Sequence, residues 1–241
     1  MIIMEAKLFL RDPAGPIFAI LLPLGLLLGL GSIPSFQEAS AEMGGQRVID
    51  TQLPGMMVIL SVVTMALSAL PAVLVAYRES GILRRLSTTP VPPVRLLIAQ
   101  VVNNIGVAVL STVLLIVLGH VTIGVPLPGS PLAFVGVFLL GTASLLGLGL
   151  LIAAVAPSVK SASGIGSLLM FPLLFVGGMW IPREMLPDLV RRIGDFLPLA
   201  PFAQALRDTW AGHAPQPLHL VVMAGTVLVT VVLAIRLFRW E

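Results

Sequence analysis

Six long apolar windows limit how this chain can fold more than any other feature. None contains Asp, Glu or Lys, and Arg236 lies in the last turn of the sixth, where its head group can reach the interface. A helix needs about 20 apolar residues to cross the hydrocarbon core of a bilayer. The sequence therefore predicts an all-α integral membrane protein. Its six transmembrane helices are expected at residues 15–33, 55–76, 96–119, 132–155, 162–180 and 218–238.

Composition supports lipid as the solvent. Hydrophobic residues make up 57% of the chain and charged residues only 10%, against about 25% charged residues in a typical soluble domain. The net charge is +3, and the basic residues are spread between apolar runs, so we expect membrane lipid and not nucleic acid as a partner. The absence of cysteine excludes disulfides, thiolate metal sites and cysteine nucleophiles, and we expect no bound metal or cofactor.

The distribution of Lys and Arg predicts the orientation. With the N-terminus inside, nine of these residues fall on the inner side and five on the outer side, and inner loops are normally the richer in positive charge. We therefore expect a multi-pass protein of the cell (inner) membrane with both termini cytoplasmic. The alternative is that residues 1–41 are a signal peptide cleaved after Ala41, but their length and the acidic Glu5 and Asp12 argue against it.

The loop at residues 77–95 is the most basic segment. Arg84 and Arg85 would each cost about 2.5–3.5 kcal/mol at the centre of a membrane helix, so the segment stays outside the bilayer. Ile82, Leu83 and Leu86 recur at helical spacing, and the prolines that follow end the helix. The pattern predicts a short amphipathic helix at the inner surface. On these grounds alone it is either a protein-docking helix or a positive anchor that touches only lipid head groups.

The order of residues in this loop resembles a known family. The run Arg78-Glu79-Ser80-Gly81-Ile82-Leu83-Arg84-Arg85-Leu86, followed by Thr89-Pro90, resembles the coupling helix of ABC-2 type transporter permeases of the daunorubicin-resistance group. In that family this helix docks onto the ATPase subunit. The resemblance implies an ATPase-coupling site made of Arg78, Glu79, Gly81, Leu83, Arg84, Arg85 and Leu86. Residues 87–89 are neutral here, so we expect the contact to depend mainly on Arg84 and Arg85.

Two further segments extend the resemblance over most of the chain, which we treat as one ABC-2 transmembrane domain, residues 1–241. Residues 7–13 look like the family's N-terminal interfacial helix, which implies that role for Lys7, Phe9, Arg11 and Asp12. Residues 177–198 resemble the segment before the last span, which in the family forms re-entrant helices at the outer surface. The simpler interpretation is an interfacial helix lying flat, with Asp188–Arg192 and Arg191–Asp195 as i,i+4 ion pairs.

The chain lacks a phosphate-binding loop. Such a loop needs two glycines before Lys-Ser or Lys-Thr, whereas Ala154 and Val159 hold those positions before Lys160-Ser161. We therefore predict no enzymatic activity in this chain, and ATP with Mg²⁺ used by a separate cytoplasmic ABC ATPase.

Small and polar residues inside the windows suggest interfaces. Gly25 and Gly29, and Ala162 and Gly166, allow close helix approach, either within one subunit or at the seam of a homodimer, as the resemblance implies. A polar face of the second window is made of Ser61, Thr64, Met65 and Ser68. These side chains either bond neighbouring helices or line a substrate path.

The expected function is the permease subunit of an ATP-driven exporter of a lipophilic substrate such as a drug or lipid. A proton- or ion-coupled transporter normally keeps an ionisable residue at membrane depth, and none is present. An intramembrane serine protease needs a G-x-S-G motif, whereas Gly164-Ile165-Gly166-Ser167 has the wrong order. A signalling or assembly role on the same fold stays open, as do the substrate, the ATPase and the choice between homodimer and heterodimer.

Overall fold

The computed structural model describes residues 14–38, 47–50, 52–82, 94–180 and 183–237. Within these ranges the chain is helical and contains no β-strand. The helices are α2 (Ala14–Gly31), α3 (Pro34–Gln37), α4 (Gln52–Thr64), η2 (Met65–Ala69), α5 (Leu70–Glu79), α7 (Val94–Ile123), α8 (Pro131–Val155), α9 (Val159–Val176), η3 (Arg183–Met185), α10 (Asp188–Gly194), α11 (Leu199–Trp210) and α12 (Pro217–Leu237).

Five described helices are long and apolar enough to cross a membrane: Gln52–Glu79, Arg95–Ile123, Pro131–Val155, Val159–Val176 and Pro217–Ala234. A sixth, α2, is apolar but shorter over Phe18–Gly31. All six predicted windows therefore coincide with helices, which confirms an all-helical membrane protein over the described residues. The count of six membrane crossings stays a prediction.

The fifth window was misplaced. The sequence predicted a span over 162–180, but α9 runs from Val159 to Val176. Its start is set by Ser158, whose Oγ accepts a hydrogen bond from the Ser161 amide at 3.2 Å, a typical N-cap. Its end is set by Gly177 and Gly178, the latter with φ +84°, which a side chain would disfavour.

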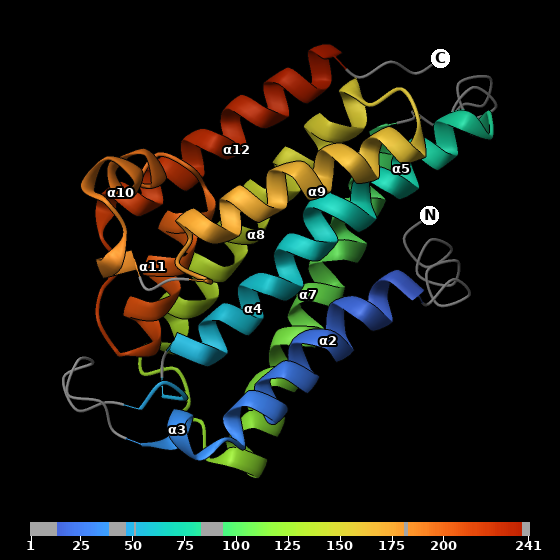
Figure 1. Ribbon diagram of the computed structural model, residues 1–241. Helices are drawn as coiled ribbons and strands as arrows, with labels where there is room; N and C mark the ends of the chain where they lie inside the picture. Colours follow the sequence, from blue (N-terminus) through green and yellow to red (C-terminus); the bar gives the residue numbers. More distant parts are fainter. Residues whose placement is uncertain (1–13, 39–46, 51, 83–93, 181–182, 238–241) are drawn as a thin grey trace.

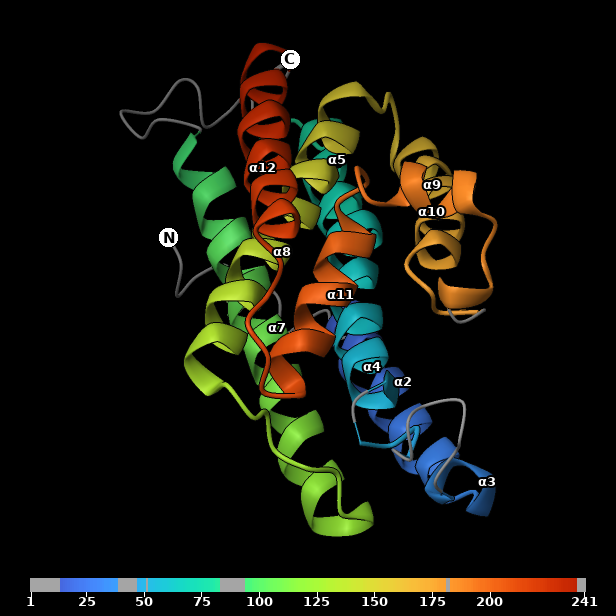
Figure 2. The same ribbon diagram turned by 90° about the vertical axis from the view of Figure 1, so that its left-hand side faces the viewer.

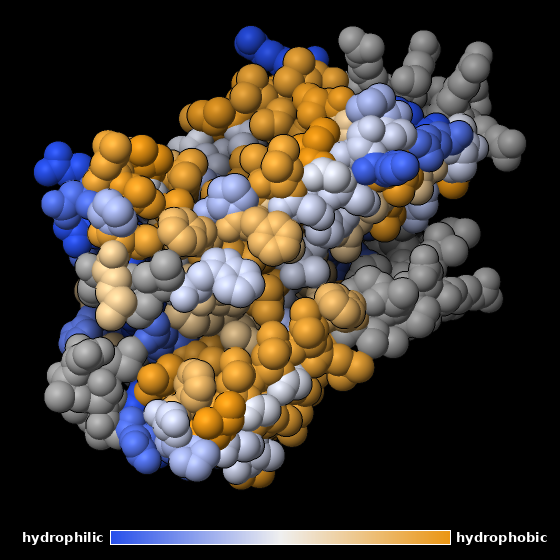
Figure 3. Space-filling model, viewed as in Figure 1, coloured by the Kyte–Doolittle hydropathy of each residue, from blue (hydrophilic) through white to orange (hydrophobic). Residues whose placement is uncertain are grey.

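The long helices lie side by side in one bundle (Figures 1 and 2). At one end of it α5 and α12 finish, α7 begins and the turn between α8 and α9 lies; we call this the Glu79 end. The opposite, Trp210 end holds α3, α10, α11 and the loop between α7 and α8. Figure 3 shows a mostly apolar surface between these two more polar ends, the pattern expected of a protein surrounded by lipid.

The second span contains a π-helical segment, Met65–Ala69, between α4 and α5. The cause lies in Pro71, which has no N–H to donate to the carbonyls four and five residues earlier, those of Leu67 and Ala66. The segment is buried, with Met65, Ala66 and Leu67 each at most 2% exposed. It divides the span into two halves with different neighbours: α4 packs chiefly against α2, α7 and α11, and α5 against α8 and α9.

Candidate functional site

Arg78 closes the end of α8. It is half-buried in the last turn of α5, and its Nη1 donates to the Ala153 carbonyl at 3.2 Å while its Nη2 donates to the Ala156 carbonyl. The Ala153 carbonyl would normally accept from the residue four positions later, but that residue is Pro157, which has no N–H. A cation at a helix C-terminus also complements the helix dipole. Arg78 therefore satisfies carbonyls that α8 itself cannot.

Glu79 closes the start of α9. Its Oε1 accepts a hydrogen bond from the Val159 amide at 3.0 Å. Val159 is the first residue of α9, so its N–H has no partner within that helix. A carboxylate at a helix N-terminus complements the dipole, as the arginine does at a C-terminus. We call Arg78 and Glu79 with the α8–α9 turn the Arg78–Glu79 clamp.

A second contact joins the same helices at the π-helical segment. An ideal Cβ on Gly149 of α8 would lie 3.0 Å from the Ala66 carbonyl carbon, and closer still to its oxygen. Gly166 of α9 has the same relation to the Leu67 carbonyl. The carbonyls of Ala66 and Leu67, five and four residues before Pro71, thus face glycines, whose Cα–H groups can approach them closely. We call this arrangement the glycine contact.

Only part of the predicted coupling site lies in the described structure. Gly81 follows α5 with φ +70°, and Ile82 is 38% exposed. The remaining members lie outside the described residues: Leu83, Arg84, Arg85 and Leu86. The same holds for all four residues of the predicted interfacial helix: Lys7, Phe9, Arg11 and Asp12. ATPase docking through these residues stays a prediction.

The four predicted path residues do not form one open face. Ser61 is fully buried, and its Oγ donates to Ser111 Oγ on α7 at 2.9 Å, the helix-to-helix bond that was the alternative interpretation. Met65 is 2% exposed. Thr64 bonds the Leu60 carbonyl at 2.7 Å, and Ser68 is half-buried. Residues 61 and 64 lie in α4, whereas the π-helical segment that begins at residue 65 changes the angular position of residue 68 relative to them.

The small residues predicted for a dimer seam divide into two groups. Gly25 and Gly29 on α2 are exposed, with open space where a Cβ would lie. Ala162 is fully buried, and Gly166 contacts Leu67 of the same chain. The second pair therefore serves packing within the subunit.

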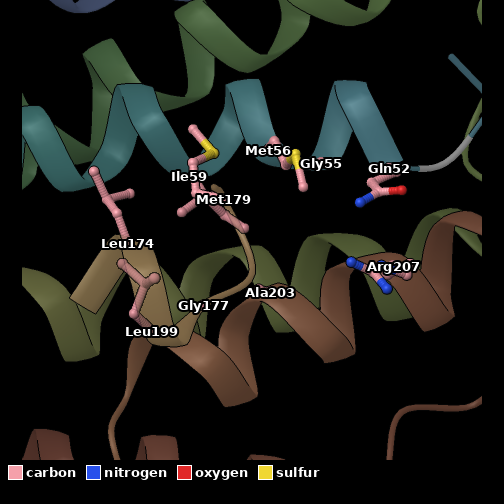
Figure 4. Close-up of a pocket in the computed structure, with 10 residues that line it drawn as sticks. All are labelled: Gln52, Gly55, Met56, Ile59, Leu174, Gly177, Met179, Leu199, Ala203 and Arg207. Atoms are coloured by element: carbon pink, nitrogen blue, oxygen red, sulfur yellow. The ribbon is translucent and has the colours of Figure 1, made fainter. Parts of the chain in front are cut away.

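Two cavities were not predicted. One is a narrow pocket of about 10 Å³ between α4, the end of α9 and α11. Figure 4 shows Gln52 and Arg207 toward one end of this pocket and apolar side chains at the other. A larger cavity of about 380 Å³, open on one side to the surface of the bundle, lies between α7 and α8 near the Trp210 end. Apolar side chains dominate its wall: Val109, Val113, Ile116, Leu127, Phe134, Val135, Phe138 and Leu139. The apolar runs in the sequence do not predict such cavities, because a cavity depends on the distance between two packed helices.

The ion pairs at the Trp210 end differ from the predicted ones. Arg191 bonds Asp188 at 2.5 Å instead of Asp195, and Asp195 pairs with Arg183, which is 8% exposed. Both predicted i,i+4 pairs were wrong. Helix α10 ends at Gly194, which leaves Asp195 beyond the helix and within reach of Arg183, and Asp188 pairs with Arg191 at i,i+3 instead of with Arg192. Arg183 also donates to the Arg191 carbonyl at 3.3 Å and so joins η3 to the C-terminal end of α10.

An apolar bundle with these polar ends defines a multi-pass membrane protein. The sequence model of the ABC-2 type transporter family matches residues 1–210, and the chain belongs to this family. It is therefore a transmembrane permease component of an ABC transporter and not itself catalytic. Membership implies association with an ATPase subunit.

Relatives agree with this assignment. The chain is 24% identical to a Bacillus subtilis protein named transport permease YvfS, over 96% of this chain and 93% of that protein. It is 29% identical to the inner membrane transport permease YhhJ of Escherichia coli, over 76% of this chain. In this second case the match spans only 51%, about half, of the relative's length.

Proposed function

We propose that this chain is the membrane subunit of an ATP-driven exporter that moves a lipophilic substrate out of the cytoplasm. The observation that carries the proposal is the Arg78–Glu79 clamp. It joins three helices at the first two residues of the run whose sequence resembles the family's coupling helix. A push on that loop by a separate ATPase, which hydrolyses ATP with Mg²⁺, would therefore reach several spans.

The proposed orientation places the Glu79 end in the cytoplasm, in the cell (inner) membrane. The excess of Lys and Arg on that side supports it, because positively charged loops are retained inside. The apolar band between the ends gives a belt for lipid contact (Figure 3). Both termini are then cytoplasmic.

A homodimer is the proposed assembly. The support comes from α9, the least apolar of the five span candidates, with hydropathy 1.6, although only 22% of it is buried. It exposes Ser163, Gly164 and Ser167 at membrane depth, where polar residues usually face other helices or a water-filled path instead of lipid. Helix α2, in which Gly25 and Gly29 are exposed, lies like α9 toward the viewer in Figure 1. A second copy covering this side would shield both helices.

The cavity between α7 and α8 supports a lipophilic substrate. Its volume of about 380 Å³ falls within the range of ligand pockets, about 300–1,000 Å³. Its apolar wall would accept a hydrocarbon group and offers little to a charged one.

Transport by reconstituted vesicles tests the proposal. The permease would be purified from native membranes with its co-purifying ATPase and reconstituted so that the Glu79 end faces outward. We expect uptake of a lipophilic dye that requires ATP and stops when the phosphate-binding lysine of the ATPase is replaced. Uptake driven by a proton gradient without ATP would contradict the proposal and favour the secondary transporter.

A further inference from the structure

We propose that Arg78 and Glu79 are positioning residues that attach the α8–α9 turn to the end of α5, so that α5, α8 and α9 move as one body when the coupling loop is pushed. This inference rests on the proposed function for the source of the push. It assigns the two residues a different role from direct contact with the ATPase. The attachment itself depends only on contacts within this chain.

The charges of the clamp match the helix ends that they meet. At the α8–α9 turn the carbonyl end of α8 lies beside the amide end of α9. Two consecutive residues of α5 with opposite charge serve them: the guanidinium of Arg78 meets carbonyls, and the carboxylate of Glu79 meets an amide. Exchanging the two residues would place each charge against the wrong end. The order Arg-Glu is therefore specific to this turn.

The partners of the clamp are main-chain groups that lack a partner within their own helices. Pro157 removes the donor that the Ala153 carbonyl would otherwise receive, and the Val159 amide is the first of α9. Breaking the clamp would leave these groups to water. The guanidinium nitrogens of Arg78 and Oε1 of Glu79 point toward the turn, so an ATPase that bonded these atoms would have to break the clamp.

The glycine contact makes the attachment rigid. It holds η2, which continues directly into α5, against α8 and α9 at residues 66 and 67, whereas the clamp joins α5 to them at residues 78 and 79. Twelve residues of helix separate the two levels by about 18 Å, at about 1.5 Å per residue. With one attachment alone, α5 could rotate about that point relative to α8 and α9. The glycine contact and the clamp, at different heights along the helices, together prevent this rotation. Beyond the π-helical segment, α4 packs chiefly against other helices, so the body ends there.

Spin-label distances test the attachment directly, since the chain has no cysteine of its own. Cysteines replacing the exposed Ser80 and Lys160 would carry one label on each side of the clamp. In the purified complex we expect a narrow distance distribution that stays unchanged when a non-hydrolysable ATP analogue is added. In the Arg78→Gln/Glu79→Gln background it should broaden, whereas Arg78→Lys should keep it narrow. A distribution that is unaffected by the double change would overturn the proposal.

Coupling provides the second measurement. In the double variant we expect the ATPase to co-purify as before and to hydrolyse ATP, while transport per ATP falls by about tenfold, the scale of losing two charge-to-helix-end contacts. Arg84→Gln/Arg85→Gln is the matched control, which should lose the ATPase itself. Loss of the ATPase from the Arg78/Glu79 variant would overturn the positioning role in favour of direct docking. If wild type binds no ATPase, the proposed function fails, while the spin labels still test the attachment in the chain alone.

Discussion

Replacing Gly149 by alanine should destabilise the bundle by pushing α8 away from the π-helical segment. A Cβ on Gly149 would lie under 3.0 Å from the Ala66 carbonyl oxygen, a distance that real Cβ atoms essentially never show. The obstacle is backbone, so no side chain can rotate away, and the helices must separate by roughly 1 Å. Overpacking of this kind costs about 1–3 kcal/mol, and a backbone obstacle puts the cost near the upper end.

Gly136→Ala is the matched control, because it lies in the same helix with open space where the Cβ would go. Alanine is favoured over glycine in a helix by about 1 kcal/mol. The control should therefore be as stable as wild type or slightly more so. We expect the two variants to differ by about 3 kcal/mol, roughly a hundredfold in the unfolding equilibrium.

Unfolding in mixed detergent micelles, followed by tryptophan fluorescence, measures this difference. Trp210 is a suitable reporter because it is 3% exposed and stacks edge-on against Phe134 at 5.3 Å. A second substitution, Gly166→Ala, presses on the same segment, so the double variant should lose less than the sum of the single losses. Equal stability of Gly149→Ala and Gly136→Ala would refute the tight contact between α8 and the π-helical segment.

Two other perturbations test the Trp210 end. Trp210→Phe removes the hydrogen bond from Nε1 to the Pro126 carbonyl at 2.9 Å and should cost about 1–2 kcal/mol, with the unpartnered carbonyl included. Because this variant lacks the fluorescent reporter, its unfolding is followed by far-ultraviolet circular dichroism. Trp180→Phe, at a site 62% exposed, should change stability by less than about 0.5 kcal/mol in the same measurement. Asp195→Ala leaves the buried Arg183 guanidinium without its ion-pair partner and should lower stability by about 3 kcal/mol. Adding Arg183→Met should recover most of that loss, and no recovery would show that the pair does more than neutralise a charge.

The apolar windows predicted the helices well, because lipid allows few other ways to satisfy the backbone. Their ends were predicted less well. The start of α9 depends on the hydroxyl of Ser158, and the Ser-x-x-Ser signal there lies just before the window that was predicted. The sequence could not predict that Ser61 and Gly166 make contacts within the chain, because a small or polar residue suits an internal contact and a subunit seam equally well.

The clamp was not predicted because Arg78 and Glu79 bond main-chain groups. Almost every residue carries such groups, so the sequence does not mark the ones that a distant side chain will bond. A signal was nevertheless present in two prolines. Pro71 has no N–H for the carbonyl of Leu67, four residues earlier, or for that of Ala66 at the π-helical spacing of five, and Pro157 has none for that of Ala153. Within the bilayer a carbonyl needs a partner in the protein, whereas at the polar Glu79 end water is an alternative. Glycine faces cover the first two carbonyls and Arg78 bonds the third, so both prolines mark places where neighbouring helices come into contact.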